Sequence, residues 1–110
     1  MTNFDAQISA LALGRLIERG DVTPRDATET YLARAHELDP DHRIYVRLTE
    51  DRARAEADAA TARAKRGMRL HPLDGVPLSW KDLFDSAGTV TAAGSKALAT
   101  RVPTHDAHVL

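Results

Sequence analysis

Lys81 is the residue of this 110-residue sequence best suited to chemistry by its type and its place. It is one of three lysines beside twelve arginines, and it lies in a stretch, 73–110, that holds few other charged residues. A lysine is able to give up its proton when it is buried, whereas an arginine is not. A lone lysine near the end of an extended segment is more often a surface cation. Both interpretations of Lys81, proton carrier and surface charge, stand at this point.

Two serines near Lys81, Ser79 and Ser95, could be considered as catalytic partners, and one acid, Asp82, is not assigned any chemistry. Ser79 lies on the same side of an extended chain as Lys81, but a Ser-x-Lys pair in one strand supplies neither an oxyanion loop nor a second serine. Sheet hydrogen bonding is therefore expected of Ser79, and bonding to the backbone is expected of Ser95. Asp82 is expected to hold the local backbone or to pair with a distant cation.

The histidines indicate no metal site. His105 and His108 are three residues apart at the start of a helix that Thr104 would cap, but a zinc ion would need further ligands, and the sequence has no cysteine. We expect both to lie at a solvated helix start. The other three are expected to be exposed near turns: His36, His42 and His71. No triad with histidine, phosphate loop or dinucleotide motif is present, so the sequence gives no support to those mechanisms.

The composition excludes several classes of protein. Without cysteine, disulfide scaffolds and cysteine nucleophiles are ruled out. A formal net charge of -1 argues against a dedicated nucleic-acid binder, which needs an excess of lysine and arginine to neutralise phosphates. No apolar run approaches the length of a membrane span. We therefore expect a cytoplasmic protein with no nucleic-acid or membrane partner.

Helices are predicted for most of the chain before Pro72. The first runs from a cap at Asp5 to a stop at Gly20, and the second runs from Pro24, after a Thr23 cap, to Leu38. The second is expected to end there because a residue before proline, here the one before Pro40, disfavours helical geometry. These two helices should form a hairpin-like pair.

A third helix is the clearest predicted element, after a short extended stretch at 44–48. It should run from Thr49 to Gly67, with an alanine stripe that must lie close against something larger. Its charged face is expected to be solvated and to carry pairs four residues apart, Arg52 with Glu56 and Arg54 with Asp58.

The segment 73–82 is predicted to be a strand. Val76, Leu78 and Trp80 alternate with Pro77, Ser79 and Lys81, so the two sets would face opposite sides of an extended chain. Lys81 would then stand at the strand end, pointing away from the bulky apolar row.

Three motifs in 73–110 together resemble the N-terminal part of the amidase signature family of amide hydrolases. They are Leu73-x-Gly75-Val76-Pro77-x-x-x-Lys81-Asp82, then Gly88-x-x-Thr91-x-x-Gly94-Ser95, and then Pro103-Thr104-x-Asp106-Ala107-x-x-Leu110. The Gly-x-Pro-x-x-x-Lys-Asp element is the most specific of the three, and the helices before it are similar to the lead-in of that family. Trp80 departs from the family pattern, in which a small aliphatic residue is common before the lysine.

The resemblance implies an α/β fold in which N-terminal helices lead into the first strands of a mixed sheet, incomplete in this chain. Residues 1–110 would be the N-terminal part of a single amidase domain, with 1–72 as a helical lead-in and 73–110 as the start of the catalytic α/β core. The segment Thr104 to Leu110 reads as the beginning of an element that is cut short. We therefore expect a fragment or one piece of an assembly.

Lys81 matches the lysine of the family's Ser, cis-Ser, Lys triad. The resemblance implies a desolvated amine that takes a proton, through a bridging serine, from the nucleophilic serine. It implies no metal and no organic cofactor. In the family both serines and the oxyanion loop lie well beyond the lysine. The chain alone is therefore expected to be inactive.

The leading functional hypothesis is amide bond hydrolysis. Its expected partners are a small-molecule amide substrate, the remainder of its own fold or a complementing chain, and possible homodimerisation. One alternative is a non-enzymatic helical module that binds a protein partner through the alanine-rich helix and the segment 73–80. Another is a glutamine amidase like the amidase component of a tRNA-dependent amidotransferase.

Overall fold

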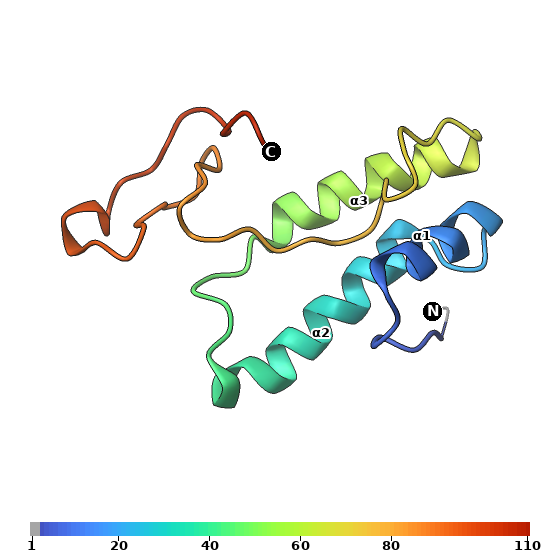
Figure 1. Ribbon diagram of the computed structural model, residues 1–110, viewed down its shortest axis with the longest axis horizontal. Helices are drawn as coiled ribbons and strands as arrows, with labels where there is room; N and C mark the ends of the chain where they lie inside the picture. The colour runs from blue at the N-terminus through green and yellow to red at the C-terminus, as the bar shows by residue number, and fades with distance from the viewer. Residues whose placement is uncertain (1–2) are drawn as a thin grey trace. The chain divides into compact units, whose positions relative to one another are not determined.

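The computed structural model describes residues 3–110 and shows three α-helices and one short 3-10 helix in that range (Figure 1). They are α1 (Ala10–Arg19), α2 (Pro24–His42), α3 (Glu50–Lys65) and η1 (Lys96–Leu98). The chain forms two compact units, Met1–Pro77 and Leu78–Leu110, which are described separately below.

The predicted α/β fold class is wrong, because residues 3–110 contain no β-strand. The stretch 44–48 is an irregular connection, and Ile44 and Val46 on it are 67% and 72% exposed. In the segment 73–82 the Val76 N–H bonds to the Leu73 carbonyl at 3.0 Å, which makes a turn. Alternation of apolar residues yields a strand only where a second strand supplies the ladder, and the described residues supply none to either segment.

Helix α1 begins later than predicted and ends where predicted. Its N-cap is Ser9, whose hydroxyl accepts from the Ala12 N–H at 3.1 Å, whereas Asp5 accepts from the N–H of Gln7 at 2.9 Å. At the other end Gly20 has a φ of 77° and closes the helix by donating its N–H to the Ile17 carbonyl at 3.1 Å. Glycine adopts this left-handed conformation without steric cost, so Gly20 was a sound stop signal.

Helix α2 begins at the predicted cap but runs past the predicted stop. The Thr23 hydroxyl accepts from the Asp26 N–H at 3.0 Å, and Pro24 takes the first helical position. The helix continues through Pro40 to His42 and ends at Arg43, with a φ of 50°. A proline in the last turn costs one backbone hydrogen bond. The Asp39 carboxylate offsets that loss by accepting from the two N–H groups after Arg43, at 2.6 and 2.9 Å.

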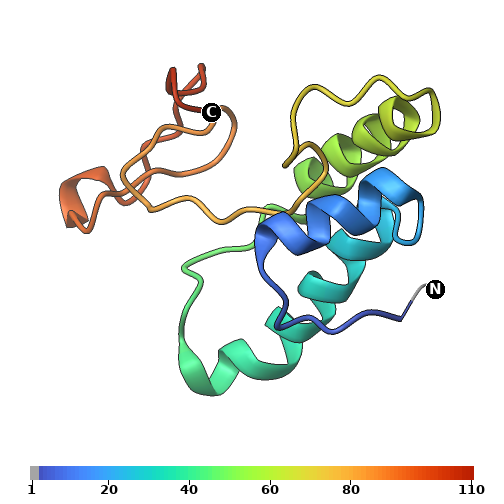
Figure 2. The same ribbon diagram turned by 45° about the vertical axis from the view of Figure 1, so that its right-hand side comes forward.

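The core of the first unit lies where α1 meets the start of α2 (Figure 2). It is built on Leu13 and Ile17 of α1, Val22 of the connecting turn and Ala27 of α2, all no more than 3% exposed. Six partly buried residues pack against this cluster, and they come from all parts of the unit: Phe4, Ile8, Leu16, Tyr31, Ala64 and Val76. The core is small, so contacts at its edge contribute much of its stability.

Helix α3 packs along α2 through small side chains, as its alanine stripe predicted. Ala57 and Ala60 are 5% and 4% exposed. Thr49 occupies the N-cap position, but its side chain makes no capping hydrogen bond. Alanine buries little area, so polar contacts carry much of the contact between α2 and α3.

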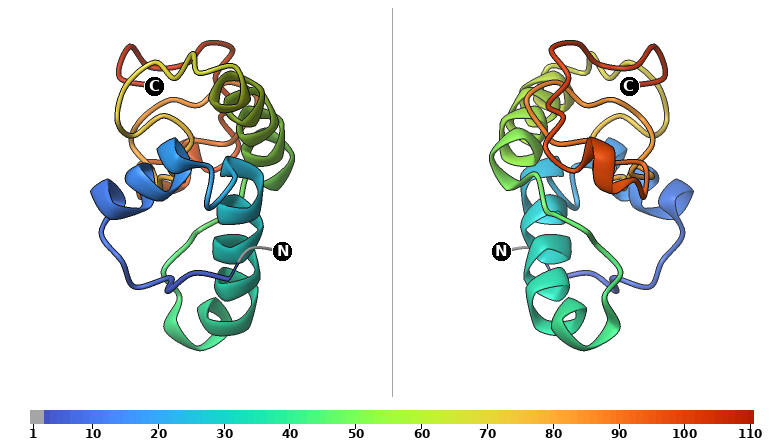
Figure 3. Two further views of the ribbon diagram at one scale, coloured as in Figure 1. Left: turned by 90° about the vertical axis from the view of Figure 1, so that its right-hand side faces the viewer. Right: turned by 90° about the vertical axis from the view of Figure 1, so that its left-hand side faces the viewer.

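The second unit consists of turns around η1 (Figure 3). Backbone hydrogen bonds join its distant parts, from Gly88 N–H to the Pro103 carbonyl at 3.0 Å and from Thr91 N–H to the Arg101 carbonyl at 3.1 Å. The helix predicted from Thr104 is wrong, since 104–110 forms turns. The Thr104 hydroxyl lies 2.9 Å from Nδ1 of His105 and so contacts that imidazole.

Candidate functional site

Lys81 starts a hydrogen-bonded turn in the second unit. Its carbonyl accepts from the N–H groups of Leu83 and Phe84, at 2.7 and 3.1 Å, and its side chain is exposed. The rings of Trp80 and Phe84 meet edge to face with their centroids 6.1 Å apart. Four large apolar side chains close to Lys81 in sequence are also exposed: Leu78, Trp80, Leu83 and Phe84. The lysine therefore sits on a turn that is rich in uncovered apolar surface.

Asp82 holds the backbone beside Lys81. Its carboxylate accepts from the Ala92 N–H at 3.3 Å, which confirms the interpretation of Asp82 as a local backbone anchor. The contact joins the Lys81 turn to the segment that leads into Gly94 and Ser95.

An ion pair with two hydrogen bonds, between Asp85 and Arg101, follows the Lys81 turn in sequence. Both carboxylate oxygens of Asp85 accept from the guanidinium of Arg101, each at 2.7 Å. The hydrogen bond from Arg101 outweighs partial burial and lowers the pKa of Asp85. The Asp85 carbonyl also accepts from the Ala107 N–H at 2.8 Å, so one residue joins three parts of the unit.

The two serines near Lys81 show no catalytic arrangement. Ser79 is exposed, and Ser95 is half-buried with its N–H donated to the Ala92 carbonyl at 2.8 Å. Within residues 3–110, neither serine side chain hydrogen-bonds to Lys81.

No group of three or more histidine, aspartate or glutamate side chains in residues 3–110 could hold a metal ion. His105 and His108 are both exposed. His36 lies 2.6 Å from the carboxylate of Glu50, and this contact links α2 and α3.

Asp74 of the segment 73–82 is a buried acid that the sequence patterns did not single out. Asp74 is 7% exposed, and its carboxylate accepts from Nε and Nη2 of Arg63 at 2.8 and 2.7 Å and from the Leu70 N–H at 3.0 Å. The paired guanidinium of Arg63 lowers the pKa of Asp74 to about 2 despite burial. The sequence does hold a sign that Asp74 is buried, because it is a lone acid among apolar residues and glycine.

Gly75 of the same segment lies too close to the helices to carry a side chain. Its φ is 90°, and an added Cβ would lie 2.5 Å from Cγ of Pro24 and 3.5 Å from Cβ of Ala60. A Cβ on Gly14 of α1 would likewise overlap the carbonyl oxygen of Pro72. The glycine of the Gly-x-Pro element is therefore required for packing on α2 and α3.

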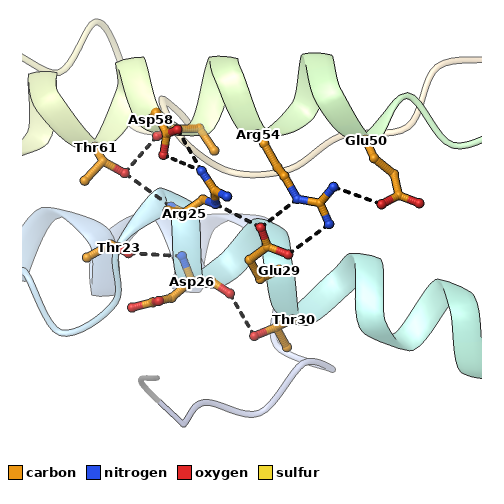
Figure 4. A network of polar contacts seen from close by, with 10 residues as sticks. Thr23, Arg25, Asp26, Glu29, Thr30, Glu50, Arg54, Asp58 and Thr61 are labelled. Carbon is orange, nitrogen blue, oxygen red and sulfur yellow. Dashed lines mark hydrogen bonds and ion pairs between the residues drawn. The ribbon is translucent and has the colours of Figure 1, made fainter.

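A network of charged residues joins α2 to α3 (Figure 4). Arg25 binds both oxygens of Asp58, at 2.8 and 2.7 Å, and also Glu29 at 2.9 Å. Arg54 binds Glu29 through two nitrogens, at 2.8 and 3.2 Å, and Glu50 at 3.0 Å. Hydrogen bonds from Arg54 and then Arg25 lower the pKa of Glu29.

This network corrects one of the two predicted ion pairs. Arg52 does bind Glu56, at 2.8 Å, as predicted. The prediction of Arg54 with Asp58 is wrong, because α2 supplies Glu29 for Arg54 and Arg25 for Asp58. Two of the observed pairs therefore cross between the helices, Arg25 with Asp58 and Arg54 with Glu29.

None of the helices in residues 3–110 is long and apolar enough to cross a membrane. The family model described as Amidase matches residues 26–110. The glutamyl-tRNA(Gln) amidotransferase A-subunit of Myxococcus xanthus (strain DK1622) is 40% identical over 103 residues, which is 94% of this chain and 21% of that protein. The protein of the same name from Chloroflexus aggregans is 41% identical over 91 residues, or 83% of this chain and 19% of that protein.

A solved structure is also similar, with a TM-score of 0.82 and 38% sequence identity over 91% of this chain and 22% of the matched chain. It is described as "An unexpected vestigial protein complex reveals the evolutionary origins of an s-triazine catabolic enzyme". The chain thus spans about a fifth of the length of the relatives it matches. On the match over 26–110 and these identities, the chain belongs to the amidase signature family.

Proposed function

We propose that this chain is the N-terminal part of a single amidase domain that hydrolyses amide C–N bonds, and that Lys81 is its catalytic lysine. The observation that carries the proposal is the family match over 26–110, which includes the Gly75-Val76-Pro77 to Lys81-Asp82 element. The identity of 40% to a much longer relative over 94% of the chain supports the same assignment.

The chemistry proposed for Lys81 is proton transfer. The amine accepts a proton, through a bridging serine, from the serine that attacks the amide carbonyl, and the proton then passes to the leaving amine. The two serines and the oxyanion donors come from the remainder of the domain. Shielding from water disfavours the charged ammonium form of a lysine, so a shielded lysine is more readily the neutral amine that accepts a proton. The uncovered side chains of Leu78, Trp80 and Phe84 provide apolar surface for such shielding beside Lys81.

A second candidate function is the release of ammonia for amide transfer. It is favoured by the names of the similar proteins, which are components of glutamyl-tRNA(Gln) amidotransferases. In that case the substrate would be a glutamine side-chain amide, and the partners would be a complementing protein chain together with an aminoacylated tRNA. The part proposed for Lys81 is the same in both reactions.

A chimaera tests the role of Lys81 without assumptions about the rest of this protein. The 103 residues that match the Myxococcus xanthus relative would replace their counterparts in that relative, and amide hydrolysis by the product would be measured. We expect the chimaera to be active, and Lys81→Ala to lower kcat by about a thousandfold or more, as the loss of a triad member does. Lys81→Arg should be equally inactive, because the guanidinium keeps its proton.

Lys96→Ala is the matched control, since Lys96 is also an exposed lysine of the second unit. It should retain the activity of the chimaera. Turnover by Lys81→Ala within a few-fold of the parent would refute the role of Lys81. The two candidate functions are distinguished in this chain joined to the remainder of its own domain, rather than in the chimaera, by measuring glutamine-dependent amidation of glutamyl-tRNA beside hydrolysis of a simple amide.

A further inference from the structure

We propose that Asp85 and Arg101 form a positioning pair for Lys81, holding the turn that carries the lysine in place. This proposal rests on the proposed function of Lys81. We do not propose that Asp85 or Arg101 contacts the substrate.

The pair lies directly after the Lys81 turn. The Lys81 carbonyl accepts from the N–H groups of Leu83 and Phe84, so the turn closes just before Asp85. The carbonyl and the carboxylate of Asp85 then bind Ala107 and Arg101, respectively. The position of the turn is thereby tied to two segments that lie well beyond it in sequence.

Arg101 completes a closed loop. Its guanidinium forms a two-pronged contact with Asp85, and its carbonyl accepts from the N–H of Thr91, which is 4% exposed. Its N–H donates to the carbonyl of Leu98 at 3.0 Å, at the end of η1. The two ends of the segment 85–101 are therefore joined by the ion pair of Asp85 with Arg101. The backbone hydrogen bond from Thr91 to Arg101 joins the end of the segment to its interior.

Asp82 attaches the lysine turn to the interior of that loop through the Ala92 N–H. The second unit has few buried apolar side chains to hold these segments, since only Thr91 and Pro103 are buried among its described residues. Polar contacts must then do most of the positioning. A two-pronged arginine–carboxylate contact fixes both distance and orientation, unlike a single hydrogen bond.

The charge state of the pair supports this role. The hydrogen bond from Arg101 lowers the pKa of Asp85, and that from Asp85 raises the pKa of Arg101, so both stay ionised at neutral pH. Breaking the contact leaves the loop ends held by backbone hydrogen bonds alone, and a displacement of about 1 Å at a catalytic group costs up to about a hundredfold in rate.

The test uses the chimaera described above. Asp85→Asn, Arg101→Gln and the double variant would be compared with the parent for kcat, KM and melting temperature. Active sites would be counted by covalent labelling of the nucleophilic serine, so that kcat refers to folded enzyme. We expect each single variant to lower kcat about 10- to 100-fold with KM changed less than about twofold. The double variant should be no slower than the slower single variant, because both changes remove one contact.

Asp58→Asn is the matched control, because Asp58 also binds an arginine through both oxygens, at similar distances, but in the first unit. It should leave kcat per labelled site unchanged. Arg101→Lys keeps the charge but loses the two-pronged geometry, and its kcat should fall between those of the parent and Arg101→Gln. If the other variants do not fold, the kcat of Arg101→Lys tests the positioning role.

A kcat per labelled site within about threefold of the parent in Asp85→Asn and Arg101→Lys would overturn the positioning role, even if the melting temperature fell. If Lys81→Ala is inactive and these variants are not slowed, only the positioning proposal fails. If Lys81→Ala is itself fully active, the proposed function fails first.

Discussion

The ion pair of buried Asp74 with partly exposed Arg63 provides a sharp test of what holds the first unit together. Pairing lowers the pKa of Asp74 from 3.8 to about 2. At about 1.4 kcal/mol for each pKa unit, the ionised carboxylate contributes about 2 kcal/mol to the free energy of unfolding. The side chain of Asp74 is 6% exposed, so solvent screening reduces this figure little.

The sign of the pH dependence follows from the lowered pKa. Between about pH 4 and pH 2 the unfolded chain binds a proton at Asp74 and the folded chain does not, so acid favours unfolding. The contribution is complete above about pH 5 and is lost as the pH falls to the folded pKa of about 2. Asp74→Asn should therefore destabilise the first unit by about 2 kcal/mol at neutral pH, and the difference from the parent should vanish near pH 2.

Urea unfolding followed by far-ultraviolet circular dichroism, at several pH values, measures this difference. Ion pairs also lower the pKa values of other acids, among them Glu29 and Glu50, but these acids are common to both proteins and their effects cancel in the comparison. Asp58→Asn is the control, because the side chain of Asp58 is 59% exposed and such pairs contribute at most about 1 kcal/mol. A difference between parent and Asp74→Asn that persists unchanged to pH 2 would refute the reasoning, as would a cost no larger than that of Asp58→Asn.

Two further predictions concern backbone features and use controls within the chain. Gly75→Ala should destabilise the first unit by about 2 kcal/mol or more, because the new Cβ would strain the backbone and also overlap Pro24. Gly67→Ala, with a φ of 67° but nothing within 4 Å, should cost only the strain, about 1 kcal/mol, so equal shifts in melting temperature would contradict the packing argument. Thr23→Ala should cost about 1 kcal/mol through its lost capping bond, measured by urea unfolding. Thr49→Ala loses no capping bond and should cost less than about 0.5 kcal/mol, and an equal cost for both would refute this account.

Local features of the fold were predictable from the sequence. The Thr23 cap, the Gly20 stop and the Arg52 with Glu56 pair each depend on residues within one helical turn, and all three are confirmed. The stop at Pro40 was also a local inference, and it is wrong because Asp39 compensates for the proline through two backbone N–H groups. That compensation depends on side-chain geometry which a proline rule leaves out.

Features that need a distant partner were less predictable. The strands at 44–48 and 73–82 were inferred from alternation, but the pairing that stabilises a strand comes from elsewhere in a chain. Arg54 was assigned to its own helix, whereas Glu29 of α2 lies within reach of it. The partner of Asp74, Arg63, lies on the preceding helix, eleven residues earlier, and no local pattern in the sequence indicates that pairing. The catalytic role of Lys81 stays a prediction.

Several residues of the segment 73–82 have a structural role that the described residues show, whereas the side chain of Lys81 has none. Asp74 binds Arg63, Gly75 fits against Pro24, and Val76 packs on the core. Asp82 binds the Ala92 N–H. Within residues 3–110, the exposed side chain of Lys81 takes part in no such contact. A motif residue that the local fold does not use is a candidate for chemistry, because packing does not account for its presence. This contrast supports the assignment of proton transfer to Lys81 and of structure to its neighbours, and the Lys81→Ala and Asp74→Asn variants test the two halves of that assignment separately.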